Sequence, residues 1–557
     1  MGRRSQSFTM SLGATLLLAL GLVSLPCSPA SALPRTGIVT SPGGLVVVTD
    51  PCLGRVEIVS FTVTPAHITL GESATLSWNV EIPEGECGYL LVTNGQLVPR
   101  QGSVTVQPLS NTSYTLSVTR RGSLVTRATT ETISVSMPID PSDPTRTKVT
   151  IPTNRPLSEV LPLFAQALGS PNTTVIVNSD LNLSGFGTIV IAEGVRLIGG
   201  RVAIPGRPFQ PGPRLYITTR PPSNKVLSVQ GDNVRITGVR LEGPNTGMGD
   251  GEVGTTGIIV DSSVNIEIDH NELYGWDGSA VEVVDSGQRI DYVLNPETVR
   301  VHDNYIHHNQ NYSKLGYGVV VGDGAYAVIE RNVFDWNRHA IAGDGSDGSG
   351  YRAYRNIVLQ HGGYQRWWGS PIGWSYTHQF DMHGQGSCGV GSLISDTVFN
   401  CGTAGHDMDI RYNSFLYTAG PAVKVRGTPQ LGPNGAFVTS NVFAHDSIDD
   451  AVEWTETGVL VQANQIDVTS WAGADSCDFD GDGISDVFMA TGQTWWFSSN
   501  HGQGPWVFLN ASTLALHDVT LGYFDGDQVC DVMAGGLISS GGTSPWKLPR
   551  LQPVLRR

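Results

Sequence analysis

The chain has 557 residues, which at roughly 150 residues per domain allows several domains and a large core. Charged residues make up only 15%, glycines number 67, and β-branched residues alternate with polar ones, so an all-β protein is favoured over a helical or disordered one. The formal net charge of −16 argues against a general nucleic-acid-binding protein, because such a protein neutralises phosphates with a basic surface.

Residues 1–32 have the features of a secretory signal peptide. Two arginines precede an apolar run at 12–25, and Ala-Ser-Ala at 30–32 supplies the small-x-small pattern required for cleavage. The run is shorter than the roughly 20 residues of a membrane-spanning helix. Cys27 suggests lipidation as an alternative, but Pro26 before it fits that processing poorly. We expect a secreted or cell-surface protein without a membrane span.

Six cysteines remain after the signal peptide, and they fall in neighbouring pairs along the chain. Among the 15 pairings that six cysteines allow, only one keeps every bridge inside a single candidate domain. It joins Cys52 with Cys87, Cys388 with Cys401, and Cys477 with Cys530. An exported protein meets oxidising conditions, so we predict these disulfides, with buried free thiols as the alternative.

Residues 54–138 follow a Pro/Gly/Thr-rich linker at 33–53 and contain short alternating stretches typical of antiparallel strands. This length suffices for a β-sandwich. The segment resembles bacterial immunoglobulin-like modules through Ser60-Phe61, Gly71-Glu72, Leu76-Ser77-Trp78 and Tyr114-Thr115-Leu116. The resemblance implies a spacer or an adhesive unit. A Pro-rich linker at 139–152 then marks a domain boundary.

The segment 153–465 carries a repeat in which an asparagine stands two residues before an apolar side chain. Its asparagines are Asn271, Asn304, Asn332, Asn356, Asn413 and Asn441. Their separations of 33, 28, 24, 57 and 28 residues fit one solenoid turn each, and the 57-residue gap holds either an extra turn or a long inserted loop. Stacked coils would align the amides in a hydrogen-bonded ladder. We therefore predict a right-handed parallel β-helix.

An amphipathic helix at 157–168 precedes this repeat. The first coil of a solenoid exposes apolar side chains and unpaired strand edges, so we expect this helix to cap it. Further along, eight basic residues between 196 and 240 accompany a single acid, Asp232. This basic segment either attracts an anionic polymer or is simply a solvated face.

The repeat resembles the right-handed β-helix repeat proteins, which include polysaccharide lyases, uronan epimerases, glycoside hydrolases and phage tailspikes. Within the 57-residue gap, the heptad 378–384 resembles the Tyr-Gly-Phe-Asp-Pro-His motif of uronan C5-epimerases and related lyases, matching at Phe380, Asp381 and His383. It departs at His378, where the family has its catalytic Tyr, and at Met382, where it has Pro. Strand alternation predicts that Asp381 and His383 share one side and His378 takes the other.

The resemblance implies abstraction of the C5 proton of a uronate. As a hypothesis, His383 or His378 is the base, Asp381 orients it, and Arg411 or Arg426 meets the substrate carboxylate. Candidate substrate-binding residues are Trp367, Trp368, Trp374, Tyr376 and His339. The expected partner is a polysaccharide or cell-surface glycan.

Two other functions stay open. A glycoside hydrolase needs two carboxylates, and Asp381 with Asp407 or Asp409 would supply them. The motif set of β-helix polygalacturonases is not recognisable, so a lyase or epimerase is favoured over a hydrolase. A non-catalytic adhesin or structural surface protein would use the same coils as a rigid rod, with these polar residues only building loops and ladders.

Residues 466–557 contain an acidic loop with calcium-ligand spacing. The predicted ligands are the carboxylates of Asp478, Asp480, Asp482 and Asp486 and the carbonyl of Ile484. No glutamate stands at the twelfth position, and the loop resembles those of FG-GAP and VCBS repeats, which implies Ca²⁺ in a propeller-like unit. No organic cofactor is expected. In a second loop at 523–531, Tyr523 replaces the first carboxylate, so any calcium affinity should be weaker.

Overall fold

The computed structural model describes most of the chain between residues 57 and 549. The described ranges are 57–81, 89–93, 96–120, 126–136, 139–140, 142–244, 254–288, 298–311, 315–362, 364–366, 374–386, 400–432, 435–469 and 471–549. The predicted signal peptide, Cys52, Cys87, Cys388, Trp367 and Trp368 lie outside them. No helix in these ranges is long and apolar enough to cross a membrane.

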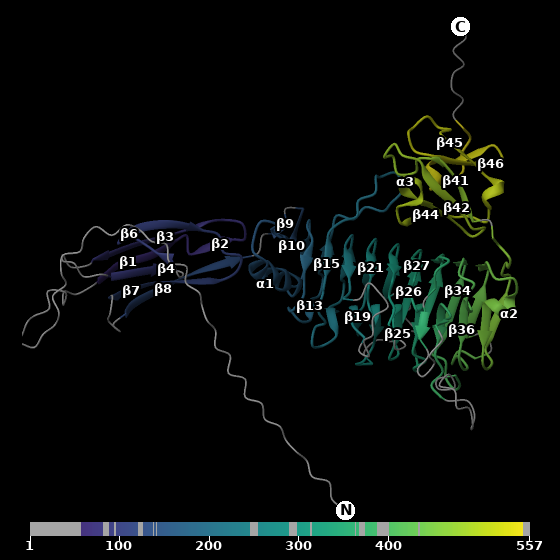
Figure 1. Cartoon of the computed structure of the whole chain (residues 1–557), viewed down its shortest axis with the longest axis horizontal. Coiled ribbons are helices and arrows are strands. Elements are labelled where there is room, and N and C mark those ends of the chain that lie inside the picture. The colour runs from purple at the N-terminus through teal and green to yellow at the C-terminus, as the bar shows by residue number, and fades with distance from the viewer. Residues whose placement is uncertain are drawn as a thin grey trace, which may run out of the picture.

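The middle of the chain is a solenoid of three stacked sheets, which we call sheets I, II and III (Figure 1). Sheet I contains β9 (Ile139–Asp140), β10 (Asp143–Thr150), β11 (Thr173–Ile176), β14 (Arg196–Ile198), β17 (Arg235–Thr237), β20 (Ile266–Asp269), β23 (Val299–His302), β26 (Tyr326–Glu330), β29 (Gly350–Tyr354), β34 (Asp407–Arg411), β37 (Ala436–Thr439) and β40 (Val459–Gln462). Apart from the antiparallel pair β9 and β10, its neighbouring strands are parallel.

Sheets II and III are entirely parallel. Sheet II contains β12 (Leu181–Asn182), β15 (Arg214–Tyr216), β18 (Arg240–Glu242), β21 (Glu272–Tyr274), β24 (Tyr305–His307), β27 (Val333–Asp335), β30 (Ile357–Val358), β35 (Ser414–Phe415) and β38 (Val442–Phe443). Sheet III contains β13 (Ile189–Ile191), β16 (Lys225–Val229), β19 (Thr256–Asp261), β22 (Ser279–Val284), β25 (Tyr317–Gly322), β28 (His339–Gly343), β33 (Phe380–Met382), β36 (Val423–Val425) and β39 (Val452–Trp454). This arrangement confirms the predicted parallel β-helix.

The predicted asparagine ladder forms at the corner between sheets I and II. From Asn304 onward, the amide oxygen of each rung accepts the side-chain and backbone N–H groups of the preceding asparagine, as when Asn332 Oδ1 accepts from Asn304 Nδ2 at 3.0 Å and from Asn304 N at 3.1 Å. In the first rung, Asn271 Oδ1 accepts the backbone N–H of Val239 at 3.0 Å. The ladder extends to Asn464, which stands two residues before Ile466 and so fits the pattern, although it was not among the six predicted members. Asn356 N donates to Asn413 Oδ1 at 2.9 Å, so the 57-residue gap is one turn with inserted loops and not two turns.

One apolar core runs through the solenoid. The apolar residues two positions after the asparagines stack inside it. In the same core, the rings of Phe380, Phe415 and Phe443 have successive centroid separations of 4.8 and 5.0 Å. At its N-terminal end, α1 (Leu157–Leu168) packs Leu163 and Phe164 into this core, as expected of a cap. The inserted loops of the long turn hold a small hairpin, β31 (Tyr364–Arg366) with β32 (Trp374–Tyr376).

Small sheets lie at both ends of the chain (Figure 1). At the N-terminal end, one sheet holds β1 (Glu57–Thr64), β3 (Ala74–Glu81) and β6 (Gln101–Val106), and the other holds β2 (His67–Thr69), β8 (Thr126–Ser136), β7 (Thr112–Arg120), β4 (Tyr89–Thr93) and β5 (Gln96–Leu97). Trp78 of β3 and Leu116 of β7 belong to one buried cluster, so the two sheets share a core.

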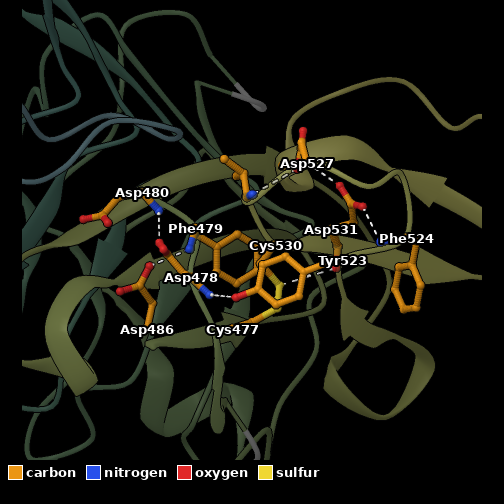
Figure 2. The surroundings of a disulfide bond; sticks show 12 residues. Cys477, Asp478, Phe479, Asp480, Asp486, Tyr523, Phe524, Asp527, Cys530 and Asp531 are labelled. Atoms are coloured by element: carbon orange, nitrogen blue, oxygen red, sulfur yellow. Dashed lines mark hydrogen bonds between the residues drawn. A yellow bond between two sulfur atoms is a disulfide. The ribbon is translucent and has the colours of Figure 1, made fainter. Parts of the chain in front are cut away.

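We call residues 471–549 the C-terminal module. Its sheets hold β41 (Ala472–Cys477), β42 (Asp486–Ala490), β43 (Thr494–Ser498) and β44 (Trp506–Ala511), and β45 (Thr520–Gly522), β46 (Asp531–Ala534) and β47 (Leu537–Ser539). Short helical turns are α2 (Ile448–Ala451) before the module and α3 (Ser499–Gly502), η2 (Leu516–Asp518) and η3 (Ser540–Gly542) within it. The Cys477–Cys530 disulfide joins the two sheets, as predicted (Figure 2). The module packs on sheet II, where Val333 and Ile357 share a buried cluster with Trp471 and Trp496.

Candidate functional site

The predicted catalytic heptad forms a cluster of titratable side chains on sheet III. Asp381 lies on β33 and is completely buried. Its Oδ1 lies 3.0 Å from His378 Nε2 and accepts a hydrogen bond from Arg426 Nε at 3.0 Å, and its Oδ2 lies 2.8 Å from His383 Nε2 and accepts from Arg426 Nη2. We call these four residues, together with His339, the Asp381 cluster.

The alternation argument was wrong for His378. It placed His378 on the side opposite Asp381, whereas the structure brings both histidines to the same carboxylate. The physical reason is that β33 contains only Phe380–Met382, so His378 and His383 lie beyond its ends, where strand alternation no longer applies. Arg426 comes one residue after β36, the strand that pairs with β33 in register, with Met382 opposite Val425.

Burial and the charges of neighbouring side chains shift the pKa values in the Asp381 cluster. Burial alone would raise the pKa of Asp381, but Arg426, His378 and His383 together hold that pKa well below its usual range. Burial lowers the pKa values of His378 and His339. Near neutral pH the cluster therefore contains an internal Asp381–Arg426 ion pair beside the neutral imidazoles of His378 and His339. The side chain of His383 is 23% exposed, against 14% for His378 and 12% for Arg426, so His383 is the most accessible titratable member.

His339 is completely buried and supports its neighbour instead of lining a groove. Its Nδ1 lies 2.5 Å from the backbone carbonyl oxygen of His378, and the two rings stack at 4.3 Å. Because a carbonyl only accepts hydrogen bonds, Nδ1 carries the proton and Nε2 carries the lone pair. This contact positions the His378 ring over β28.

Several predicted residues lie apart from the Asp381 cluster. Arg411 is on β34 of sheet I, where it pairs with Asp409 and covers the Phe437 ring at 5.1 Å. Asp407 is also on β34 and accepts a hydrogen bond from Tyr326 at 2.8 Å. Asp381 is on sheet III, so neither the Arg411 alternative nor the two-carboxylate pairs for hydrolysis are brought together.

The inserted loops contain the remaining predicted residues. Trp374 and Tyr376 lie on β32, in the hairpin of the long turn. Cys401 is disulfide-bonded, and its predicted partner Cys388 lies outside the described residues. Of the four predicted aromatic substrate-binding residues, the structure thus places only Trp374 and Tyr376, by their backbone positions in β32.

The first acidic loop gathers three of its four predicted carboxylate ligands. Carboxylate oxygens of Asp478, Asp480 and Asp486 lie within 4.8 Å of one another (Figure 2). Asp482 is outside this group, because its Oδ1 accepts the backbone N–H of Ile484 at 2.7 Å. The three grouped side chains are buried. Burial and the two neighbouring carboxylates raise the pKa of Asp486 to about 7.

The first acidic loop differs from three other groups of side chains that could hold a metal in whether a cationic side chain neutralises the carboxylates. In those groups a cationic side chain already pairs with a carboxylate: Arg426 with Asp381, Arg235 with Asp269, and Lys547 with Asp525 at 3.1 Å. Within the described residues, the Asp478, Asp480 and Asp486 carboxylates have no ion-pair partner. A divalent cation would neutralise them, whereas Lys547 already compensates part of the charge of the second loop, so the chemistry of the first loop suits calcium better.

Two features of sheet II were not predicted. The rings of His308, Trp336 and His361 stack in series at 5.7 and 4.5 Å. Beside them, Asp335 Oδ1 lies 3.4 Å from His361 Nδ1 but accepts no hydrogen bond, and burial raises the pKa of Asp335 to about 6. No local signal reveals such a stack, because its members come from successive coils and meet only when those coils are in register.

Comparisons with known proteins do not identify a family for this chain. No protein-family model matches the sequence, and the comparison with curated proteins finds no match. A family 28 exopolygalacturonase from Yersinia enterocolitica aligns with 12% identity and a TM-score of 0.26, over 71% of this chain and 94% of that one. The ORF18 protein of Geobacillus virus E2 aligns with 12% identity and a TM-score of 0.33, over 78% of this chain and 85% of that one. Neither likeness bears on what this chain acts on.

Proposed function

We propose that this chain is a secreted protein that acts on a uronate-containing polysaccharide by removing the C5 proton of a sugar residue. The observation that carries the proposal is the convergence of Asp381, His378, His383 and Arg426 on sheet III. A buried carboxylate that holds imidazoles and an arginine in fixed positions provides the preorganisation that acid–base catalysis requires.

Three of these four groups have a role in this reaction. His383, the most accessible titratable member, takes the C5 proton, and Asp381 orients it and stabilises the imidazolium that forms. Arg426 uses Nε and Nη2 for Asp381, which leaves Nη1 to face the substrate carboxylate. The electron pair left at C5 either expels the O4 substituent, giving a C4–C5 double bond, or is reprotonated from the opposite face. The imidazolium of His383 returns its proton to the departing O4 in the first outcome, and water supplies the proton to C5 in the second.

The flanking units serve this activity in our proposal. The N-terminal sandwich is an immunoglobulin-like spacer, and the C-terminal module is an FG-GAP-like unit that binds one calcium ion at Asp478, Asp480 and Asp486. A signal peptide directs the chain outside the cell. The alternative of a non-catalytic surface rod has one observation in its favour, the complete burial of Asp381 and His339.

A pair of histidine variants tests the proposal. Wild-type protein is screened on a panel of uronans for unsaturated products by ultraviolet absorbance and for altered C5 configuration by NMR. We expect His383→Ala to lower turnover roughly 100-fold or more while the thermal unfolding midpoint changes little, because His383 is partly exposed and supplies the base.

His406→Ala is the matched control. His406 Nδ1 lies 2.6 Å from Asp407 Oδ1, its side chain is 21% exposed, and it precedes β34 of sheet I and makes no ion pair with Asp381. Turnover should be unchanged in this variant. Full turnover in His383→Ala, or no product from any uronan with the wild type, would remove the enzymatic proposal in favour of the rod.

A further inference from the structure

Arg201 differs from the other arginines of the basic segment. Four of them have carboxylate partners: Arg214 with Glu242 at 2.9 Å, Arg220 with Asp277, Arg235 with Asp269 at 2.7 Å, and Arg240 with Asp180 at 3.6 Å. Arg201 is only 6% exposed, and within the described residues it has no carboxylate partner. Arg196, Arg207 and Lys225 have no ion-pair partner among the described residues either, but they are exposed, so Arg201 is the buried member of the segment without one.

The hydrogen bonding of Arg201 is also incomplete. Nη1 donates to the backbone carbonyl of His270 at 3.0 Å, and the guanidinium carbon lies 5.8 Å from the centre of the Phe209 ring. Nε is buried and has no partner. A guanidinium offers five N–H donors, and a buried charge is costly unless it is paired and hydrogen-bonded. Glu272 interacts electrostatically with Arg201 but forms no ion pair with it, so the buried Nε remains open to an acceptor. Burial lowers the pKa of Arg201 to about 10, which leaves it charged at neutral pH.

A cavity of about 90 Å³ adjoins this guanidinium, between the solenoid and the C-terminal module. Tyr305 of β24 lines it on one side, and Trp506 and Phe508 of β44 line it on the other. The second arginine in the lining, Arg331, is already neutralised by Asp303 and Glu330, each at 2.8 Å. Of the two arginines in the lining, Arg201 is therefore the one without an ion-pair partner among the described residues.

We propose that this cavity binds the carboxylate of one sugar-acid residue, with Arg201 receiving the carboxylate and the Trp506 and Tyr305 rings flanking the sugar. Planar guanidinium groups bind carboxylates bidentately, and aromatic rings supply apolar contact to sugar faces. The cavity is small against the roughly 300 to 1,000 Å³ of ligand pockets, so it admits the carboxylate while the sugar ring stays at its mouth. This inference rests on the proposed function in one respect, since the proposed function is the reason for choosing a uronate as the ligand.

The experiment uses the full chain. Trp fluorescence and calorimetry follow titration with a triglucuronide, with the neutral glucose trisaccharide of the same linkage, and with sodium acetate. We expect binding of the triglucuronide, little binding of the neutral sugar, and acetate binding weaker by roughly tenfold or more, because acetate lacks the ring contacts. Arg201→Gln should weaken triglucuronide binding at least roughly tenfold. Arg207→Gln, an exposed arginine of the same loop, should not.

The outcomes separate this inference from the proposed function. The inactive His383→Ala variant should still bind the triglucuronide at the cavity, so lost turnover with retained binding bears on the Asp381 cluster alone. Equal binding of the neutral sugar, equal binding of acetate, or unchanged binding in Arg201→Gln would overturn the inference. If Arg201→Gln does not fold, Trp506→Ala takes its place, and unchanged binding in that variant overturns the inference equally.

Discussion

At the scale of single residues, two carboxylates with the same burial have opposite titration behaviour. Asp381 and Asp486 are both completely buried. Arg426 and two histidines hold the pKa of Asp381 well below its usual range, whereas Asp480 and Asp478 add to burial and raise the pKa of Asp486 to about 7. The sign of the neighbouring charge therefore decides which carboxylate is stable as an anion.

The raised pKa of Asp486 predicts a pH-dependent stability in the absence of calcium. A group whose folded pKa exceeds its unfolded value stabilises the fold below the unfolded pKa and loses this contribution as pH rises through the folded pKa. With chelator present, the Asp486 contribution should thus decline from about pH 4 to pH 7, and calcium at pH 7 should raise the thermal unfolding midpoint.

The Asp486 contribution is isolated by comparing wild type with Asp486→Asn across this pH range. Histidines such as His378 titrate with the opposite sign, but they cancel in the difference. In the second loop, Asp525→Asn should leave the calcium response intact, because Lys547 already compensates Asp525. A calcium response that survives Asp486→Asn but disappears in Asp525→Asn would reverse the assignment of the two loops.

At the scale of structural elements, the asparagine ladder joins each coil to the next through buried amides. Asn332 donates from Nδ2 to Val301 O at 2.8 Å and to Asn356 Oδ1 at 3.1 Å, and its own oxygen accepts from Asn304. Such a side chain provides hydrogen-bond partners for backbone N–H and C=O groups at a corner where strands do not pair. The ladder is therefore a structural device that fixes the stacking of coils.

Removing one internal rung should be expensive. We expect Asn332→Ala to lower the free energy of unfolding by about 3 kcal/mol, because it leaves buried donors and acceptors of both neighbours unpaired. Asn464→Ala, at the partly exposed end of the ladder, should cost about 1 kcal/mol, since water replaces the lost amide. Urea unfolding measures both, and equal costs at the two positions would contradict the burial argument.

At the scale of the whole molecule, the C-terminal module is held against the solenoid by apolar packing and by the loop that carries Arg201. Met489 and Trp496 are buried in the cluster shared with sheet II. Gly206 N donates to Phe479 O at 2.8 Å, and Phe209 N donates to Asp480 Oδ2 at 3.3 Å. The acidic loop thus adjoins the same docking surface as the proposed anion cavity.

A charged side chain placed in the interface between sheet II and the C-terminal module should separate the module from the solenoid. Met489→Asp buries a carboxylate among apolar side chains, so we expect an increased radius of gyration in small-angle scattering and faster proteolysis between the solenoid and the module. Leu548→Asp, at a position 75% exposed, should behave as wild type. An unchanged scattering profile for Met489→Asp would mean that the docking does not depend on this cluster.

The sequence by itself determined the features that repeat within each coil. Asparagine followed by an apolar residue at each turn was sufficient to predict the solenoid, its ladder and its stacked core, because these features recur at short range in every rung. The acidic loop was likewise predictable from ligand spacing alone. The short helix at 157–168 was predictable as a cap because its apolar stripe faces one direction.

Only the tertiary structure decided which distant side chains meet. It brought Arg426 and not Arg411 to Asp381, placed Lys547 in the second acidic loop, and left Arg201 buried without a carboxylate. These outcomes depend on strand register, on the length of β33 and on the docking of a separate module. No local pattern records such contacts, because the partners lie tens of residues apart and long-range electrostatic pairing is set by the packed arrangement.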